Sequence, residues 1–297
     1  MKALSYPRRQ GEQQRLATGE MGLPIHLPGV APMPEPQWVA PGRDSRPLSN
    51  AAEVWRARSR TSEEEITRLQ HVLSDAECSQ AERFRRSVDR ACFVTSHALL
   101  RLLLSVRLDV EPRLVVFATS KHGKPHLTPS LAADPIFFNM THSQGAILIA
   151  LSGREIGIDA ESPKDIPEVL DIAERFFSTE EANALRYSQE EVRRTLFFRF
   201  WTMKEAVLKL TGSGIAGGLD SFSLPAVHHS DPFAAPVSWN VEGRARYPEW
   251  SATRVVSFSA WPDVPAAVAW QPPLERLRFF EGDPLLIKIL QDPTAAV

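Results

Sequence analysis

The sequence predicts an α+β protein of two halves, each with short strands and one long helix. Two long stretches have helical character, residues 81–108 and residues 190–210. In the first, apolar residues recur three and four positions apart, and the second ends at the glycine stop Gly212–Gly214. Short apolar or alternating segments, typical of strands, surround both stretches. The order of elements is therefore similar in the two halves, although no residue-level repeat is visible.

Prolines are concentrated at the N-terminus: eight of the 24 lie in the first 50 of the 297 residues. This segment mixes Pro, Gly, Arg and Gln without an apolar period, which is typical of disorder. Its apolar anchors are Ile25, Leu27, Trp38 and Val39, which could hold part of the segment against the domain as a strap.

We therefore divide the chain into four parts. They are a mostly disordered Pro-rich extension at 1–50, a first half at 51–155, a second half at 156–272 and a peripheral tail at 273–297.

The first half is predicted to start with an alternating strand at 54–58. A helix start follows at 61–65, where a capping hydroxyl precedes three acids. The long helix comes next, with Phe84 and Val88 at the beginning of its apolar stripe. The other elements expected here are a strand at 114–118, a Gly- and Pro-containing loop at 121–125, and paired strands at 136–140 and 146–151.

The second half is predicted to start with a strand at 156–161. Ser178 is expected to cap a helix that begins at Thr179. The other elements expected here are helices at 166–177 and 190–210 and strands at 221–224, 237–241, 255–260 and 266–270.

Composition excludes several classes of protein. Lys and Arg number 34 against 36 Asp and Glu, a net charge of −2, so no overall basic field attracts nucleic acid. The longest apolar run is six residues, at 146–151, far short of the ~20 that span a bilayer, and the first ten residues lack a signal-peptide core. Cys78 and Cys92 fit neither a metal motif nor a disulfide framework. We expect a cytoplasmic protein without nucleic-acid or membrane partners.

Two carboxylates share one face of the strand at 156–161. Residues two apart on a strand point the same way, so Gly157, Asp159 and Glu161 face away from the apolar Ile156 and Ile158. Such a carboxylate pair suits Mg²⁺, which combines a few carboxylates with waters and phosphate oxygens. A solvated strand face is the alternative.

A second charged pair lies on the helix at 190–210. Glu205 and Lys209 are four residues apart and share a helical face. They could supply a third metal carboxylate and a phosphate ligand, or they could form an ordinary surface ion pair.

Three weaker signals precede these. The loop Lys121–Pro125 offers Gly123 for close approach and Lys124 as a point charge for phosphate, or it is a generic turn. Thr141 and His142 lie between two apolar strands, where the histidine could donate to a phosphate or be a satisfied turn residue. A cluster of arginines at the start of the first long helix is either a solvated face or a phosphate site: Arg83, Arg85, Arg86 and Arg90.

Taken in order, these motifs resemble the 4′-phosphopantetheinyl transferases, in particular the long single-chain, surfactin-synthetase-activating type. The stretches that match are GIDAE at 157–161, FFS at 176–178, FWTMKEAVLKLTGSG at 200–214, KHGKP at 121–125 and FNMTHS at 138–143. The W-x-x-K-E-x-x-x-K element some 40 residues after G-x-D-x-E is the most specific part. The resemblance covers about residues 55–272 and does not reach the extension.

The resemblance implies a pseudo-twofold fold of two subdomains with coenzyme A in the cleft between them. It also implies an enzyme that needs Mg²⁺ and moves the phosphopantetheine arm of coenzyme A to a serine of an acyl or peptidyl carrier protein, releasing adenosine 3′,5′-bisphosphate. Members of this type act on carrier proteins of secondary metabolism and of lysine or fatty acid pathways. Since one chain supplies both sides of the cleft, we expect a monomer.

Residue by residue, the resemblance assigns roles to the motifs. Asp159, Glu161 and Glu205 are similar to the metal ligands, and Lys209 to the lysine at the pyrophosphate. The residues that are similar to other coenzyme A ligands are Thr141, His142, Lys121, Gly123, Lys124, Pro125, Arg86 and Arg90. Thr141 stands where the family often has serine, a change that keeps the hydroxyl.

The resemblance leaves the general base and the docking face open. Glu205 or Glu161, directly or through a water, could take the serine proton, and Glu181 is a further candidate. Arg193, Arg194, Phe197 and Phe198 are candidates for the carrier-protein docking face, although the two phenylalanines are also natural core residues. The competing functions are another Mg²⁺-dependent phosphotransferase or pyrophosphatase, and a coenzyme A or carrier-protein binding module without turnover.

Overall fold

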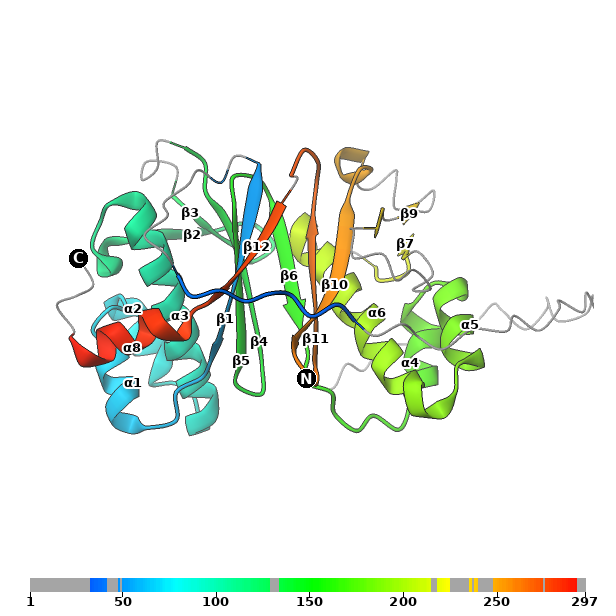
Figure 1. The fold of residues 1–297 in the computed structure, drawn as a ribbon, viewed down its shortest axis with the longest axis horizontal. Helices are drawn as coiled ribbons and strands as arrows, with labels where there is room; N and C mark the ends of the chain where they lie inside the picture. Colours follow the sequence, from blue (N-terminus) through cyan, green and yellow to red (C-terminus); the bar gives the residue numbers. More distant parts are fainter. Residues whose placement is uncertain are drawn as a thin grey trace, which may run out of the picture.

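The computed structural model describes residues 33–41, 48, 50–128, 134–214, 218–224, 235–236, 238–239, 248–274 and 276–292. Two four-stranded sheets lie next to each other in the middle, and helices cover their outer faces (Figure 1). The α+β prediction is confirmed, with a sheet and one long helix in each half.

The first half contains a sheet in the order β12-β1-β5-β4. Its strands and those of a small hairpin are β1 (Ala51–Arg58), β2 (Phe117–Thr119), β3 (Pro125–Leu127), β4 (Phe137–Ser143), β5 (Ala146–Ser152) and β12 (Arg276–Glu281). Its helices are α1 (Glu63–Gln70), α2 (Asp75–Ala81), α3 (Ser87–Leu108), the 3-10 turn η1 (Pro112–Leu114) and α8 (Asp283–Gln291).

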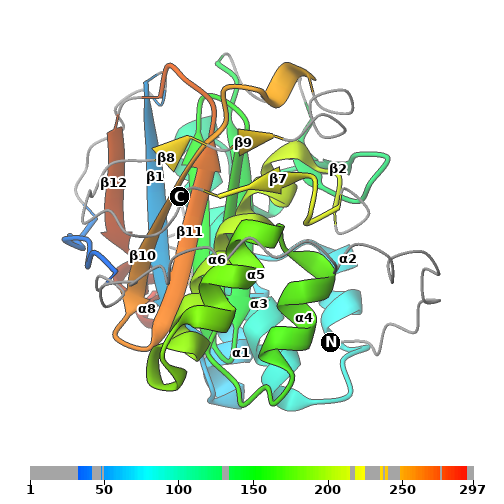
Figure 2. The ribbon, with the colours of Figure 1, turned by 90° about the vertical axis from the view of Figure 1, so that its right-hand side faces the viewer.

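The second half contains a sheet in the order β6-β11-β10-β8. Its strands and those of a second small pair are β6 (Ile156–Ala160), β7 (Phe222–Ser223), β8 (Ala235–Pro236), β9 (Ser238–Trp239), β10 (Arg254–Trp261) and β11 (Val264–Trp270). Its helices are α4 (Val169–Phe176), α5 (Thr179–Tyr187), α6 (Glu190–Thr211) and the turn η4 (Pro248–Trp250). Figure 2 shows α4, α5 and α6 together on the outer side of this half.

The core has three parts. One lies between the first sheet and α1, α3 and α8, and a second between the other sheet and α4 to α6. A third lies between the two sheets, where Val54 and Leu148 meet Ile158, Phe258 and Val268. Alternation along each strand creates these layers, since one set of side chains faces the helices and the other faces the opposite sheet.

The C-terminal segment differs from the peripheral tail that we expected. Strand β12 pairs in parallel with β1, from Ala51↔Arg276 to Arg56↔Glu281. Helix α8 follows and buries Leu286 and Ile289 in the core of the first half. The last described part of the chain therefore returns to the half where the fold began.

Part of the N-terminal extension forms a strap, defined here as residues 33–41, which crosses β12 and β10 (Figure 1). Trp38 packs against Phe258 and Phe279, one from each half. The Val39 amide donates to the Phe279 carbonyl at 3.1 Å, and Val39 accepts from the Glu281 amide at 2.9 Å. Trp38 thus packs on the domain as expected, whereas the Val39 side chain is exposed and Val39 is held through its backbone. Ile25 and Leu27 lie outside the described residues.

The helix predicted at 81–108 begins at Ser87 instead, after a turn that follows α2. Helix α2 ends at Ala81 and α3 starts at Ser87, so Arg83, Arg85 and Arg86 lie on the exposed turn between them. Phe84 and Val88 are 37% and 57% exposed and do not join the core. Helix α3 is long and apolar enough to cross a membrane by composition alone, but most of it is buried inside the protein.

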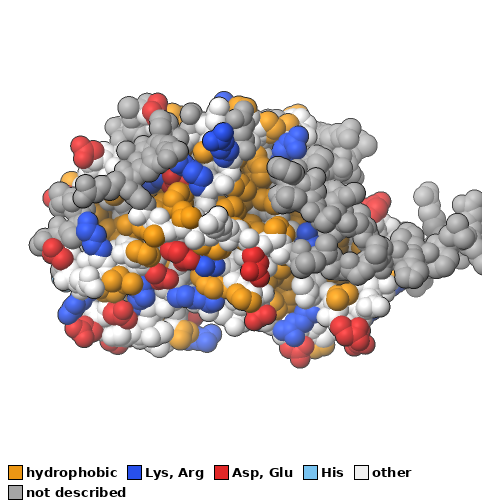
Figure 3. Space-filling model, viewed as in Figure 1, with side chains coloured by type: hydrophobic (Ala, Val, Ile, Leu, Met, Phe, Trp, Pro, Cys, Tyr) orange, Lys and Arg blue, Asp and Glu red, His pale blue; other side chains and the backbone are white. Residues whose placement is uncertain are grey.

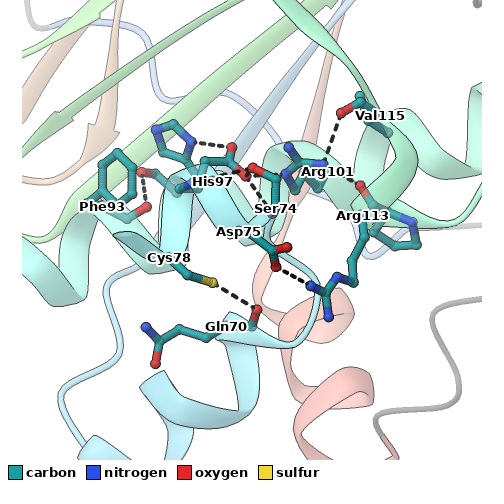
Figure 4. A network of polar contacts seen from close by, with 12 residues as sticks. Gln70, Ser74, Asp75, Cys78, Phe93, His97, Arg101, Arg113 and Val115 are labelled. Carbon is teal, nitrogen blue, oxygen red and sulfur yellow. Dashed lines mark hydrogen bonds and ion pairs between the residues drawn. The ribbon is translucent and has the colours of Figure 1, made fainter. Parts of the chain in front are cut away.

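A buried polar network joins α2 to α3 (Figure 4). The Glu77 carboxylate caps α2 at Ser74 and accepts from His97 at 2.9 Å and from Arg101 at 2.6 Å. Burial alone would raise the pKa of Glu77, but the hydrogen bonds from His97 and Ser74 and the charge of Arg101 lower it to about 2. The network orients these helices behind the first sheet.

Candidate active site

The predicted carboxylate face of β6 points at helix α6. Ile156, Ile158 and Ala160 join the core between the sheets, as alternation predicted. On the other face, Asp159 is 4% exposed. Its Oδ1 accepts hydrogen bonds from Lys209 Nζ at 2.7 Å and from Thr141 Oγ1 at 3.0 Å. One oxygen thus links the second half to β4 of the first.

Strand β4 supplies this link because three polar residues alternate along it. Asn139, Thr141 and Ser143 are all buried and face β6. Asn139 Oδ1 accepts from the Ile158 amide at 2.8 Å, and Ser143 Oγ donates to Glu161 Oε2 at 2.9 Å. Asn139 and Ser143 were not predicted to be site residues. The signal that could have identified them is the polar side chain at every second position of this strand.

Gly157 allows α6 to lie directly on β6. A Cβ at this position would be 2.0 Å from the Ala206 carbonyl oxygen and 2.4 Å from the Leu210 nitrogen. Only glycine permits such an approach between two backbones. The approach brings Glu205 and Lys209 of α6 to Asp159.

Substituting Gly157 therefore tests whether the close approach of α6 to β6 positions Glu205 and Lys209. We expect Gly157→Ala to lower the free energy of unfolding by about 1–3 kcal/mol or more, because α6 must move away from β6. Catalytic turnover should fall further than this loss explains, since Glu205 and Lys209 move with the helix. Urea unfolding and turnover of the folded protein measure the two effects. Gly282→Ala is the control, since a Cβ there is also crowded, by the Leu99 side chain at 2.8 Å and the Arg56 carbonyl oxygen at 3.1 Å, but it lies between β12 and α8, outside the site. Equal effects of the two variants would contradict the close-approach argument.

Two carboxylate oxygens at this site have no hydrogen-bond partner. Asp159 Oδ2 and Glu205 Oε1 are both buried and unpaired. Burial and the neighbouring charge of Asp159 raise the pKa of Glu205 to about 7. Burial and Asp159 likewise raise the pKa of Glu161. Unpaired buried carboxylates with raised pKa values are typical of a cation site.

The three carboxylates do not stand as a finished metal cage. Among the described residues, no three His, Cys, Asp or Glu side chains are grouped closely enough to hold a metal ion unaided. Lys209 occupies one Asp159 oxygen instead. An incomplete set of carboxylates could still hold Mg²⁺, because Mg²⁺ is usually bound by one or two carboxylates together with substrate phosphates and waters.

Comparison with known proteins identifies the family of the chain. The family model of the 4′-phosphopantetheinyl transferase superfamily matches residues 155–269. The 4′-phosphopantetheinyl transferase HetI of Nostoc is 38% identical over 170 residues, which are 57% of this chain and 72% of that protein. The 4′-phosphopantetheinyl transferase psf-1 of Bacillus pumilus is 33% identical over 211 residues, 70% of this chain and 83% of that protein. Sfp of Bacillus subtilis is 32% identical over 163 residues, 55% of this chain and 70% of that protein.

The chain belongs to the 4′-phosphopantetheinyl transferase superfamily. The resemblance seen in the sequence is thereby confirmed, and the chain is an enzyme of this transferase class. The family match begins just before β6 and includes Asp159, Glu161, Glu205 and Lys209.

Within this transferase, His142 lies apart from Thr141. Successive residues on β4 alternate, so Thr141 faces β6 while His142 projects from the opposite face and is exposed. Desolvation by surrounding atoms and the positive charges of Lys209 and His97 lower the pKa of His142.

The expected phosphate-binding cations have different surroundings. Lys121 is exposed on its turn, and Arg86 is exposed at the N-cap of α3. Arg90 is held by Glu63 at 2.6 Å and by Gln70. Lys124 Nζ contacts Glu155 Oε2 at 2.5 Å and the Leu210 carbonyl at 3.1 Å. Thus Lys121 and Arg86 stand free of ion pairs in the described chain, whereas Arg90 and Lys124 are engaged.

The structure removes Glu181 as a candidate base. Glu181 is 1% exposed and pairs with Lys204 Nζ at 2.8 Å, and it completes the capping box with Ser178. A carboxylate enclosed in this way cannot reach a substrate hydroxyl. Lys204 was not predicted to have a role of its own, although it is fully buried and donates to the carbonyls of Leu219 and Phe222.

The candidate docking residues on α6 are also mostly structural. Phe197 and Phe198 are 1% and 3% exposed and belong to the core of the second half. Arg193 donates to the carbonyls of Leu185 and Ser188 at the end of α5. Only Arg194, whose side chain is 46% exposed, remains open at the surface.

Proposed function

We propose that this enzyme transfers the 4′-phosphopantetheine arm of coenzyme A to a serine hydroxyl of an apo acyl or peptidyl carrier protein. The by-product is adenosine 3′,5′-bisphosphate. The observation that carries this proposal is that Asp159, Glu205 and Lys209 meet at one site. Asp159 and Glu205 each have one buried carboxylate oxygen there without a hydrogen-bond partner. The relatives named 4′-phosphopantetheinyl transferase support the same reaction.

Asp159, Glu161 and Glu205 would hold Mg²⁺ in this proposal. Their chemistry fits, because they are oxygen ligands and two of them have a buried oxygen without a partner. When bound, the ion offsets negative charge on the pyrophosphate of coenzyme A. Lys209, with its side chain 29% exposed, contributes a further positive charge from the end of α6.

Coenzyme A would lie between the halves, with contacts from both. The residues that we propose around it are Lys121, Gly123, Lys124, Pro125, Thr141, His142, Asp159, Lys209, Arg86 and Arg90. Of the two arginines proposed for the 3′-phosphate, exposed Arg86 is free to reach a ligand, whereas Arg90 would first leave Glu63. The positive charge needed for this anion would be local, because the net charge of the chain is −2 and the face seen in Figure 3 mixes both signs.

In the transfer step, the serine oxygen forms a bond to the β-phosphorus of coenzyme A. The bond from that phosphorus to the bridging oxygen breaks, and adenosine 3′,5′-bisphosphate leaves with the electron pair. The serine proton passes to Glu205 or Glu161, directly or through a water.

We also propose that the enzyme works as a monomer in the cytoplasm, on carrier proteins of secondary metabolism. A single chain supplies both sides of the site, with Thr141 from one half and Asp159 from the other. Both cysteines are free thiols, which is typical of a reducing compartment.

The decisive experiment is a mass-shift assay. Apo-carrier protein incubated with this enzyme, coenzyme A and Mg²⁺ should gain the mass of phosphopantetheine, and adenosine 3′,5′-bisphosphate should appear in equal amount. Omitting Mg²⁺ with a chelator present should stop the reaction. Binding of coenzyme A without any mass gain, across a panel of carrier proteins, would favour a binding module instead. Hydrolysis of coenzyme A without carrier modification would favour a pyrophosphatase.

A further inference from the structure

The loop at Lys121–Pro125 is a closed turn with little freedom. The Ser120 amide donates to the Lys124 carbonyl at 2.9 Å, and the Gly123 amide donates to the Ser120 carbonyl at 2.9 Å. The Lys124 amide donates to Ser120 Oγ at 3.1 Å. Gly123 has a φ of +89°, which favours glycine. The backbone that carries Lys124 is therefore fixed between β2 and β3.

From this turn the Lys124 side chain crosses from the first half to the second. Its ammonium group contacts Glu155 Oε2 at 2.5 Å, the Leu210 carbonyl at 3.1 Å and the Ile156 carbonyl at 3.4 Å. The side chain is 15% exposed. An ammonium group has three N–H donors, and three acceptors surround this one. No donor remains for a phosphate oxygen.

The acceptor on α6 is significant because of its place in the helix. Leu210 lies in the last turn, where carbonyl groups lack partners within the helix and the helix dipole is negative. A cation is therefore favourable here. The same end of α6 carries Lys209, and Glu205 lies just over one turn earlier. A contact that holds Leu210 thus also sets the position of these two residues.

We propose that Lys124 is a positioning residue, a latch that fixes the catalytic end of α6 to the loop lining the proposed coenzyme A site. In this view the Lys124 side chain connects two parts of the same chain, and the backbone of the loop faces coenzyme A. Glu155, the residue just before β6, is the acidic partner of its ammonium group, and the Ile156 and Leu210 carbonyls are its contacts in the second half. This inference rests on the proposed function, because it concerns the geometry of that site.

The test compares Lys124→Met, Glu155→Gln and the double variant. Initial rates are measured against coenzyme A concentration at saturating carrier protein, below the unfolding temperature of every variant. As a latch, each single variant should lower kcat/KM by about 10-fold, with part of the loss in kcat because Lys209 is displaced. The double variant should lose little more than either single one, because both substitutions break one contact.

A direct phosphate ligand would behave differently. Lys124→Met would then raise KM for coenzyme A alone, and Glu155→Gln would leave activity unchanged or improve it by freeing the lysine. That result would overturn the latch. Arg113→Met, which breaks an exposed ion pair with Asp75 in the same half, is the matched control and should leave kcat and KM unchanged. Wild-type enzyme in the same assay tests the proposed function separately, because absence of transfer there concerns the reaction and not the latch.

Discussion

Replacing Glu205 by Gln, or Asp159 by Asn, should lower kcat/KM for carrier-protein modification by about 100- to 1,000-fold. Each change keeps the shape of the side chain but removes a negative charge from the pair with unpaired buried oxygens. Mg²⁺ would lose a charged ligand, and in Asp159→Asn the partner of Lys209 would also be neutralised. The activity that remains should need a higher Mg²⁺ concentration than wild type. A Mg²⁺ titration of the mass-shift assay measures both quantities.

Glu191→Gln is the matched control for this prediction. Glu191 is also on α6 but is exposed in its first turn, far from Asp159. It loses the same charge, and its transfer rate and Mg²⁺ requirement should equal those of wild type. If Glu205→Gln keeps more than a tenth of wild-type activity at the same Mg²⁺ requirement, Glu205 is not a metal ligand.

The sequence predicted the local parts of this site well because they depend on short-range periodicity. Strand alternation placed Asp159 and Ile158 on opposite faces of β6, as the structure shows. Helical spacing placed Glu205 and Lys209 on one face of α6. The glycine stop is also observed, since Gly212 ends α6 with a φ of +68°. Each of these predictions concerns residues within one element.

Predictions that depended on long-range contacts were less successful. Lys124 was expected to bind a phosphate because the sequence shows no partner for a lysine in this Gly- and Pro-containing loop. In the fold its ammonium group donates to Glu155 and to the Leu210 carbonyl. The tail at 273–297 looked peripheral because nothing in its sequence shows that part of it, β12, pairs with β1 near the other end of the chain. Packing decides which strands pair across such long separations in sequence, and the periodicity of apolar residues does not reveal it.

Lys204 is the clearest case of a residue whose role the sequence hides. It stands next to Glu205 in the W-x-x-K-E element, so the sequence suggests that both residues contact the substrate. Adjacent helix positions point in directions about 100° apart, and Lys204 instead enters the core of the second half. There it contacts Glu181 and lies 4.5 Å from the Phe222 ring centroid. The motif thus combines one residue for the site with one for the fold.

Lys204→Met should accordingly destabilise the protein by about 3–5 kcal/mol, because it leaves the carboxylate of Glu181 buried without its cation. It also removes the donor to the Leu219 and Phe222 carbonyls, which holds the segment at 218–224 against α6. Urea unfolding followed by circular dichroism measures the change. The double variant Lys204→Met/Glu181→Leu should recover part of the loss, since replacing both partners of a buried pair by apolar groups costs far less than removing one.

Arg194→Met is the control on the same helix. Its guanidinium is exposed and 4.0 Å from Asp165, so its loss should cost less than about 1 kcal/mol. The decisive comparison is between stability and turnover of the folded protein. If Lys204 were catalytic, Lys204→Met would lower turnover without changing the stability of the protein. If Lys204 is a structural anchor, the variant is less stable but still transfers phosphopantetheine under conditions where it stays folded. Because Glu181 caps α5 and also binds the Leu224 amide at 2.8 Å, the loss should extend to the elements that α6 holds in place.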